Sequence, residues 1–185
     1  MDQATTTSTS SSIGNPTSAI HLGGHPLPPL IELESTSGGY IDLFLLSLQR
    51  PVLLFIYPRT ASEGEQVSDS WKNIPGAFGC TSHLRSVQES VKTLQAKEKD
   101  LVVFGLSGQS AKEQKSFSDR FKLGFPLLSD KDLLLQKALD LPTFTWNQNT
   151  YLQRITLLLR EGQVTQYQFP IPQPTKAAEE ALKML

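Results

Sequence analysis

Two short apolar segments stand out from a largely polar chain, PVLLFIYP (51–58) and DLVVFGLS (100–107). Neither segment alternates between polar and apolar positions, and the first one stops at Pro58. Continuous apolar runs of this length are typical of strands that are buried on both faces of a sheet. The pattern therefore predicts two central strands.

Helical spacing follows each of these predicted strands. Apolar positions recur every three or four residues over 81–97, which predicts a helix. Ser110 and Glu113 have the spacing of a capping box and predict the start of a second helix that runs to about residue 121. A helix-like stretch covers 131–139, and Thr175 is the expected cap of a final amphipathic helix.

The segment RITLLLREGQVTQYQFP (154–170) predicts a β-hairpin that turns at Glu161-Gly162. The resulting order is strand, helix, strand, helix, hairpin and helix. Helices that alternate with buried strands indicate an α/β fold, and the hairpin makes its sheet mixed. We therefore expect a thioredoxin-like mixed sheet flanked by helices. A flavodoxin-like sheet is the alternative, but it needs more parallel strands and no terminal hairpin.

The chain divides into a polar tail and one domain. Residues 1–20 are rich in Ser and Thr, and we expect them to be a disordered tail because they bury too little apolar surface to offset chain entropy. Residues 21–185 are enough for a single domain with a hydrophobic core. Within it, residues 59–79 form a long polar loop, and such loops are often functional.

Charge and targeting signals narrow the function classes. The chain carries 17 basic and 18 acidic residues, so no basic excess points to nucleic acid or to an anionic membrane. No apolar run approaches the length of a membrane span. Residues 1–20 contain no apolar h-region, and the first basic residue of the chain is Arg50, which argues against secretory and transit signals. We expect a cytoplasmic protein.

Cys80 is the only cysteine of the 185 residues. A single cysteine excludes an intrachain disulfide and a multi-cysteine zinc site. Three scattered histidines do not form a metal cage either, so we expect no metal and no cofactor. A lone thiol of this kind suits a reducing, intracellular compartment.

The position of Cys80 suggests chemistry. It follows the first predicted strand and a Gly-rich loop, and it stands where the next helix starts. Functional sites collect at this edge of α/β sheets, and the free N–H groups of a helix start stabilise a thiolate. The alternative is a small apolar side chain that happens to begin a helix.

Several motifs, in their order along the chain, resemble a peroxiredoxin. They are the strand that ends in Tyr-Pro, the sequence Gly-Cys-Thr at 79–81, and Phe-Pro-Leu-Leu-Ser-Asp at 125–130, followed by a hairpin that carries an arginine. The likeness runs from about Gly24 to the C-terminus. It is greatest to the bacterioferritin-comigratory (Q-type) group, and within it to a branch whose long insert ends in Ile-Pro-Gly-Ala-x-Gly-Cys-Thr.

The resemblance assigns roles to three residues. Cys80 would attack the terminal oxygen of a peroxide and become a sulfenic acid. Arg154 matches the family arginine, whose cation would stabilise the thiolate and the charge that develops on the peroxide. The alternative for Arg154 is a solvated charge at a strand edge. Pro58 matches the proline of the family signature and would shield the thiol from water.

The chain also departs from the family pattern. Ala77 stands where the family has a threonine, so Thr60 or Thr81 would have to supply the hydroxyl. Arg85 stands where Q-type members often have a resolving cysteine, so an external thiol must reduce Cys80. Glutathione or a thioredoxin-type protein would be that reductant.

His83 occupies a position where the family usually has Glu or Gln. It could hold a proton or orient a substrate near Cys80. The alternative is an ordinary surface histidine.

Three functions remain open for this sequence. The first is a one-cysteine thiol peroxidase that acts on hydrogen peroxide or organic hydroperoxides, as a monomer or homodimer. The second is a redoxin-fold enzyme repurposed for another reaction, such as a biosynthetic step. The third is a non-catalytic redoxin-like binding domain. Retention of both Cys80 and Arg154 favours an enzyme.

Overall fold

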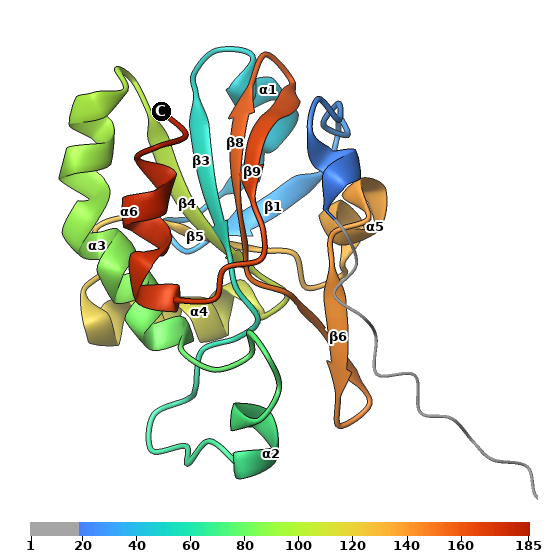
Figure 1. Cartoon of the computed structure of the whole chain (residues 1–185), viewed down its shortest axis with the longest axis vertical. Coiled ribbons are helices and arrows are strands. Elements are labelled where there is room, and N and C mark those ends of the chain that lie inside the picture. The colour runs from blue at the N-terminus through green and yellow to red at the C-terminus, as the bar shows by residue number, and fades with distance from the viewer. Residues whose placement is uncertain (1–18) are drawn as a thin grey trace, which may run out of the picture.

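The computed structural model describes residues 19–185 and has a pair of parallel strands at its centre (Figure 1). β3 (Val52–Ile56) pairs with β4 (Val102–Ser107) over the whole length of β3. Every residue of β3 is buried, as expected for a strand whose two faces are both covered. The prediction of two neighbouring central strands is confirmed. The predicted tail (1–20) lies outside the described residues except for its last two positions.

The main sheet of the described residues is mixed, in the order β2-β1-β5-β4-β3-β8-β9. β5 is parallel to β4, whereas β8 is antiparallel to β3, so the terminal hairpin extends the sheet as predicted. A flavodoxin-like arrangement is therefore excluded. The remaining strands of this sheet are β1 (Glu32–Ser35), β2 (Tyr40–Asp42), β5 (Leu127–Ser129), β8 (Ile155–Arg160) and β9 (Gln163–Gln168).

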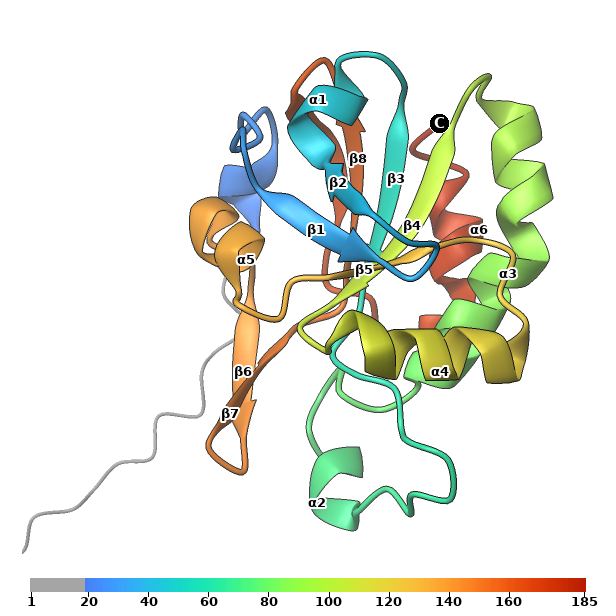
Figure 2. The ribbon, with the colours of Figure 1, turned by 180° about the vertical axis from the view of Figure 1, so that it is seen from behind.

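Helices cover both faces of the sheet and give it two hydrophobic cores. Apolar side chains of α3, α4 and α6 form one core with one face of the sheet. Those of α1 and α5 form the other, and Figure 2 shows both helices on the side where β1 and β2 lie. These helices are α1 (Leu43–Ser47), α3 (Cys80–Lys97), α4 (Ala111–Phe121), α5 (Leu134–Leu139) and α6 (Ala177–Ala181).

Two of the predicted helices are well matched. α3 begins at Cys80 itself, one residue before the predicted start, and ends at Lys97. α4 has the predicted capping box, in which the Ser110 side chain accepts from the Glu113 backbone N–H and the Glu113 side chain accepts from that of Ser110. Each device satisfies a backbone donor that the helix start leaves free.

Two other helices were predicted incorrectly. α5 begins at Leu134 rather than at residue 131, and its first cap residue, Leu133, has a left-handed conformation. Thr175 does not cap the last helix, because it lies inside a 3₁₀ turn (Pro174–Lys176) and Lys176 precedes α6 without a side-chain cap. The preceding proline-rich segment fits that tight turn better than an α-helical start.

Several short elements were not predicted at all. The β1–β2 hairpin, β5 and α1 fall in segments that the sequence pattern left unassigned. The polar loop at 59–79 also contains a short helix, α2 (Asp69–Lys72). A separate two-stranded hairpin joins β6 (Thr143–Trp146) to β7 (Asn149–Leu152). Elements of three to five residues carry too few positions for a period to emerge.

One edge of the sheet brings distant segments together. The last residue of β3, Ile56, pairs with Ile155, the first residue of β8. Arg154 therefore lies next to the carboxyl end of β3, from which the chain runs into the 59–79 segment. The same segment returns to start α3, as Figure 1 shows below β3. This edge holds the candidate site.

Candidate active site

Cys80 is the first residue of α3, and the turn before it depends on a glycine. Gly79 has φ of 96°, a left-handed conformation that favours glycine. A Cβ atom built on Gly79 would also lie 3.0 Å from Cγ of Pro174. The Cys80 side chain is 5% exposed, and its Sγ lies 3.5 Å from the carbonyl oxygen of Ala77. The thiol thus sits in a recess at the start of a helix, whose first N–H groups have no partner within the helix itself.

Arg154 reaches the thiol from the start of the hairpin. Its Nη2 lies 3.4 Å from Cys80 Sγ and also donates to the carbonyl oxygens of Gly76 (3.3 Å) and Phe78 (3.1 Å). The side chain is buried, with an exposed fraction of 2% for the residue. The alternative of a solvated strand-edge charge is therefore wrong. The two carbonyl bonds fix the loop before Cys80 and the guanidinium at the same time.

No carboxylate neutralises Arg154 among the described residues. Its Nε is buried without a hydrogen-bond partner there. A buried cation without a counter-ion is costly, and an opposite charge nearby relieves that cost. Among the described residues, the Cys80 thiol is the group in contact with Arg154 that can become an anion, so a negative charge that forms on its sulfur during a reaction would lie against this cation.

His83 contacts the guanidinium of Arg154 through Nη1, whereas Cys80 is contacted by Nη2. Nδ1 of His83 lies 2.7 Å from Nη1 of Arg154. Burial, and then the nearby Arg154 cation, hold the pKa of His83 well below its ordinary value of 6.5. The ring is therefore neutral, and because guanidinium only donates, Nδ1 accepts and Nε2 carries the proton. The alternative of a surface histidine is wrong, since His83 is fully buried.

The ring of His83 is held by packing as well as by Arg154. It meets the Phe55 ring edge to face, with centroids 5.8 Å apart and an interplanar angle of 78°. Its Nε2 has no hydrogen-bond partner within residues 19–185. His83 does not line the pocket over the thiol, so this geometry suits a residue that positions Arg154 rather than one that touches substrate.

Tyr57 is a further buried group that the sequence analysis did not identify. Its hydroxyl donates to Oε1 of Gln114 at 2.6 Å. Burial, and then the charge of Cys80, raise the pKa of Tyr57 well above its ordinary value of 10. Tyr57 therefore stays neutral beside Cys80. Its burial could have been predicted from the sequence, because Tyr57 stands at the end of a continuous apolar run.

A pocket of about 250 Å³ opens over the thiol. Val67, Trp71 and Phe78 supply apolar wall, and Thr81 and Arg85 lie at the α3 side. Among the residues described, no acidic side chain lines this pocket. The predicted substrate-binding residue Thr81 is thus brought to the thiol.

Pro58 and Thr60, which the sequence analysis also placed at the substrate, do not line this pocket. Pro58 is buried, and its carbonyl oxygen accepts from the Ser107 hydroxyl. The Thr60 hydroxyl donates to Oε1 of Gln109. Both residues therefore contact the end of β4 or its connection to α4 rather than the pocket. Ala77 lines the pocket with a buried methyl group.

The 59–79 segment is anchored as a wall of the pocket by an aromatic cluster. Trp71 of α2 packs against Phe144, Trp146 and Tyr151 of the β6–β7 hairpin, with ring centroids 4.8 to 5.5 Å apart. The Arg59 guanidinium lies 5.0 Å from the Trp71 ring centroid. The segment is therefore packed against the body of the protein.

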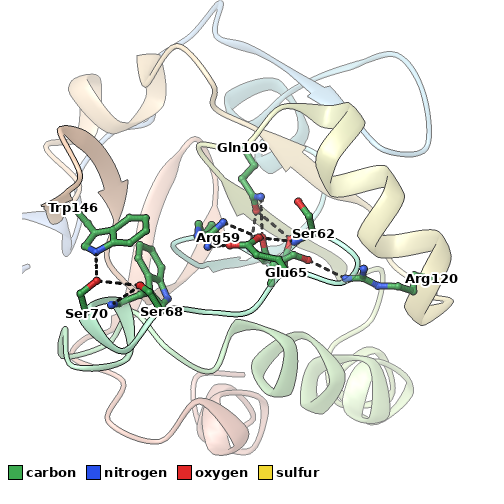
Figure 3. A network of polar contacts seen from close by, with 11 residues as sticks. Arg59, Ser62, Glu65, Ser68, Ser70, Gln109, Arg120 and Trp146 are labelled. Atoms are coloured by element: carbon green, nitrogen blue, oxygen red, sulfur yellow. Dashed lines mark hydrogen bonds and ion pairs between the residues drawn. The ribbon is translucent and has the colours of Figure 1, made fainter.

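Polar contacts hold the same segment, as Figure 3 shows. Arg59 forms an ion pair with Glu65, and Nε1 of Trp146 donates to the Ser70 hydroxyl at 3.2 Å. Arg120 donates to the carbonyl oxygen of Ala61 at 2.9 Å. These bonds tie the start of the segment to α4 and its middle to β6, so the pocket has a built wall.

Neither a metal cage nor a membrane-spanning helix occurs in the described part of the chain. Between residues 19 and 185, no cluster of three or more His, Cys, Asp or Glu side chains is placed to hold a metal ion. Within the same range, no helix has the length and apolar character to cross a membrane.

Comparisons with known proteins agree on one family. The model of the AhpC/TSA family matches residues 72–167. Chloroplastic peroxiredoxin Q of Sedum lineare is 27% identical over 159 residues, which cover 85% of this chain and 75% of that protein. The chain spans 54% to 65% of the length of five further plant relatives, all named as peroxiredoxin Q.

Solved structures share the fold. A PrxQ variant of Xylella fastidiosa superimposes with a TM-score of 0.68 at 22% identity, over 87% of this chain and 92% of that one. The bacterioferritin comigratory protein of Xanthomonas campestris, described for its alkyl peroxide reduction activity, gives a TM-score of 0.64 at 22% identity. That alignment covers 85% of this chain and 94% of the other. The thioredoxin-like fold expected from the sequence is confirmed.

Proposed function

The chain belongs to the AhpC/TSA family, within its Q-type peroxiredoxins, and from this premise we propose that it is a one-cysteine thiol peroxidase. Its substrates would be hydrogen peroxide or organic hydroperoxides. The observation that carries the proposal is the buried contact between Arg154 and Cys80 Sγ at 3.4 Å. No other anion-forming group of the described residues contacts this cation.

In the first step the Cys80 thiolate attacks the terminal oxygen of the hydroperoxide. An S–O bond forms, the O–O bond breaks, and the leaving oxygen takes a proton to depart as water or an alcohol. Cys80 becomes a sulfenic acid. Arg154 is placed to stabilise the thiolate and the charge that develops on the peroxide oxygens. Its bonds to the Gly76 and Phe78 carbonyls hold it in place during the step.

In the second step an external thiol reduces Cys80. The chain has no other cysteine, so the sulfenic acid condenses with an outside thiol to a mixed disulfide and releases water. A second thiol then frees the Cys80 thiol as a new disulfide forms. Glutathione or a thioredoxin-type protein fits this role. A symmetric bond between two copies is disfavoured because the thiol is only 5% exposed.

The proposal is tested by turnover in the presence of thiols. Purified protein with excess glutathione or a thioredoxin system should consume hydrogen peroxide, while mass spectrometry detects the Cys80 sulfenic acid as a trapped adduct. Cys80→Ser should abolish consumption. Multiple turnovers that persist in this variant would show that the thiol is not the reacting group.

Two alternatives raised by the sequence are not favoured. A non-catalytic binding domain has no use for a buried cation directed at a thiol. A repurposed enzyme would fit the loss of both the family threonine, here Ala77, and the resolving cysteine, here Arg85, but an external thiol can replace the second. The Thr81 hydroxyl lies in the same pocket and can take the place of the threonine hydroxyl.

Cellular location and assembly remain predictions. We expect a cytoplasmic monomer or homodimer, whereas six plant relatives are named as chloroplastic proteins. Fractionation of the source cells with an antibody to the chain would test the location. Light scattering of the reduced protein would give the assembly state.

A further inference from the structure

Arg85 is an unpaired cation beside the thiol. It lines the same pocket as Cys80 and is exposed. No hydrogen bond or ion pair engages it within the part of the chain that the structure describes. The other two arginines near the site differ, since Arg59 is paired with Glu65 and Arg154 is buried against its partners. A charge left open to the pocket is available to a ligand.

The geometry of α3 directs Arg85 toward the same space as the helix start. Arg85 follows Thr81 by four residues and Ser82 by three, so the three side chains share one helix face. Both Thr81 and Ser82 line the pocket as well. Five residues separate Arg85 from Cys80, a rise of roughly 7.5 Å along the axis. A small molecule can therefore contact both ends at once.

The other residues that line the pocket indicate which chemical groups such a molecule carries. The pocket has no acidic lining residue among those described, and Val67, Trp71 and Phe78 give it an apolar part. Its other cation outside the thiol contact, Arg59, is already paired with Glu65. A guanidinium prefers a carboxylate, which it can bind through two N–H groups. The site thus suits a small molecule with a carboxylate at one end and a reactive atom at Cys80.

We propose that Arg85 binds the carboxylate of a small anionic thiol, of which glutathione is the model, and so selects the reductant of Cys80. The inference rests on the proposed peroxidase function, in which a thiol must enter this pocket twice per turnover. Hydrogen peroxide carries no group for Arg85. A protein thiol would have to reach a 5% exposed sulfur past the packed 59–79 wall, which a small thiol avoids.

The step balances without any further reactant. The Cys80 sulfenic acid and the thiol form an S–S bond, and the hydroxyl leaves with the thiol proton as water. A second thiol attacks the outer sulfur of the mixed disulfide, so Cys80 is released as the thiolate and the two small thiols leave joined. Arg85 takes no proton or electron in either step, and it only holds the carboxylate.

The test compares thiols that differ in charge. Wild type and Arg85→Gln are assayed with hydrogen peroxide and saturating or limiting glutathione, 3-mercaptopropionate, 2-mercaptoethanol or cysteamine. Lys92→Gln removes an exposed charge from the same helix outside the pocket and is the matched control. Comparing variants within each thiol cancels the different reactivities of the thiols themselves.

The expected result is a change in preference. The ratio of kcat/KM for glutathione to that for 2-mercaptoethanol should fall about three- to tenfold in Arg85→Gln, as for the loss of a partly exposed charge pair. The ratio for cysteamine should rise, and Lys92→Gln should match wild type. Equal losses for all four thiols, or thioredoxin as the only working reductant, would overturn the inference.

Two further assays distinguish a reductant subsite from a peroxide subsite and from a loss of peroxidase activity. A carboxylated alkyl hydroperoxide is compared with hydrogen peroxide in the oxidation step, and an Arg85 effect confined to that step would assign the carboxylate to the peroxide and overturn the reductant role. The reduced protein is also titrated with an anionic and a neutral aromatic disulfide. Slower reaction of Arg85→Gln with the anionic reagent supports the subsite even if peroxide turnover, and with it the proposed function, fails.

Discussion

Nη1 of Arg154 lies 2.7 Å from Nδ1 of His83, and this bond joins the start of the terminal hairpin to the helix that carries the thiol. It directs the other guanidinium nitrogen, Nη2, at Cys80 Sγ. Because His83 stays neutral, the pair keeps one positive charge and does not add a second. The histidine therefore fixes the arginine without adding a second charge beside Cys80.

Replacing Arg154 with Met should slow the chemistry of Cys80. The side chain keeps its approximate length but loses the cation and the bond to sulfur, so the thiolate is less stable. Charge-assisted hydrogen bonds contribute about 1.5 to 3 kcal/mol, which predicts a fall of about tenfold or more in the iodoacetamide alkylation rate at pH 7. Alkylation that is quenched at a series of times and followed by mass spectrometry measures this rate.

Arg160→Met is the control for that experiment, since Arg160 lies on the same hairpin and is paired with Glu98 away from the thiol. It should alkylate like wild type. Equal rates in wild type and Arg154→Met would disprove the stabilising contact.

The buried neutral His83 should make the folded protein sensitive to acid. The pKa of His83 in the folded protein lies well below 6.5. Between that pKa and 6.5, His83 is protonated in the unfolded chain and neutral in the native state. The associated stability is complete above about pH 6.5 and is lost as the pH falls toward the folded pKa. The loss is up to about 1.4 kcal/mol per pH unit.

His83→Gln isolates this effect. Glutamine can still accept from Arg154 but does not titrate, so the difference in unfolding free energy between wild type and variant should shrink by the same slope between pH 7 and pH 5. Urea denaturation at several pH values gives the two curves. Parallel curves would mean that the pKa of His83 is the same in the folded and unfolded states, and so would contradict its burial as a neutral ring.

Gly79→Ala should destabilise the start of α3. A side chain at φ of 96° costs about 1 to 2 kcal/mol, and the new Cβ would also meet Pro174 at 3.0 Å. Gly64→Ala provides a comparison, because Gly64 has φ of 74° with nothing within 4 Å of its Cβ. Thermal unfolding should show the larger loss for Gly79→Ala. An equal loss in both variants would show that the approach to Pro174 adds nothing to the strain at Gly79.

The strands that were predicted from the sequence are those whose own residues determine their burial. β3 is apolar throughout and lies between two helical layers, so its pattern is complete within five positions. β5 has only three residues, and its partner β1 lies more than 90 positions earlier in the chain. Short strands of this kind are set by their partners, which a local pattern does not contain.

The same distinction applies to the site. The helix start at Cys80 follows from local sequence, and the family resemblance brought Arg154 to it. The burial of His83 could not be predicted, because its neighbours in the helix include the exposed Ser82 and Arg85. Its burial depends on Arg154, which lies 71 residues away. Trp71 was missed for a similar reason, since its aromatic partners come from another hairpin.

The stoichiometry of peroxide consumption without a reductant shows whether the Cys80 sulfur is the atom that reduces peroxide. Reduced protein is mixed with a slight molar excess of hydrogen peroxide, and the peroxide that remains is measured together with the intact mass. One peroxide should be consumed rapidly per chain, the chain should gain one oxygen atom on Cys80, and Cys80→Ser should do neither. Continued consumption without added thiol, or the same consumption in Cys80→Ser, would contradict the role of this sulfur.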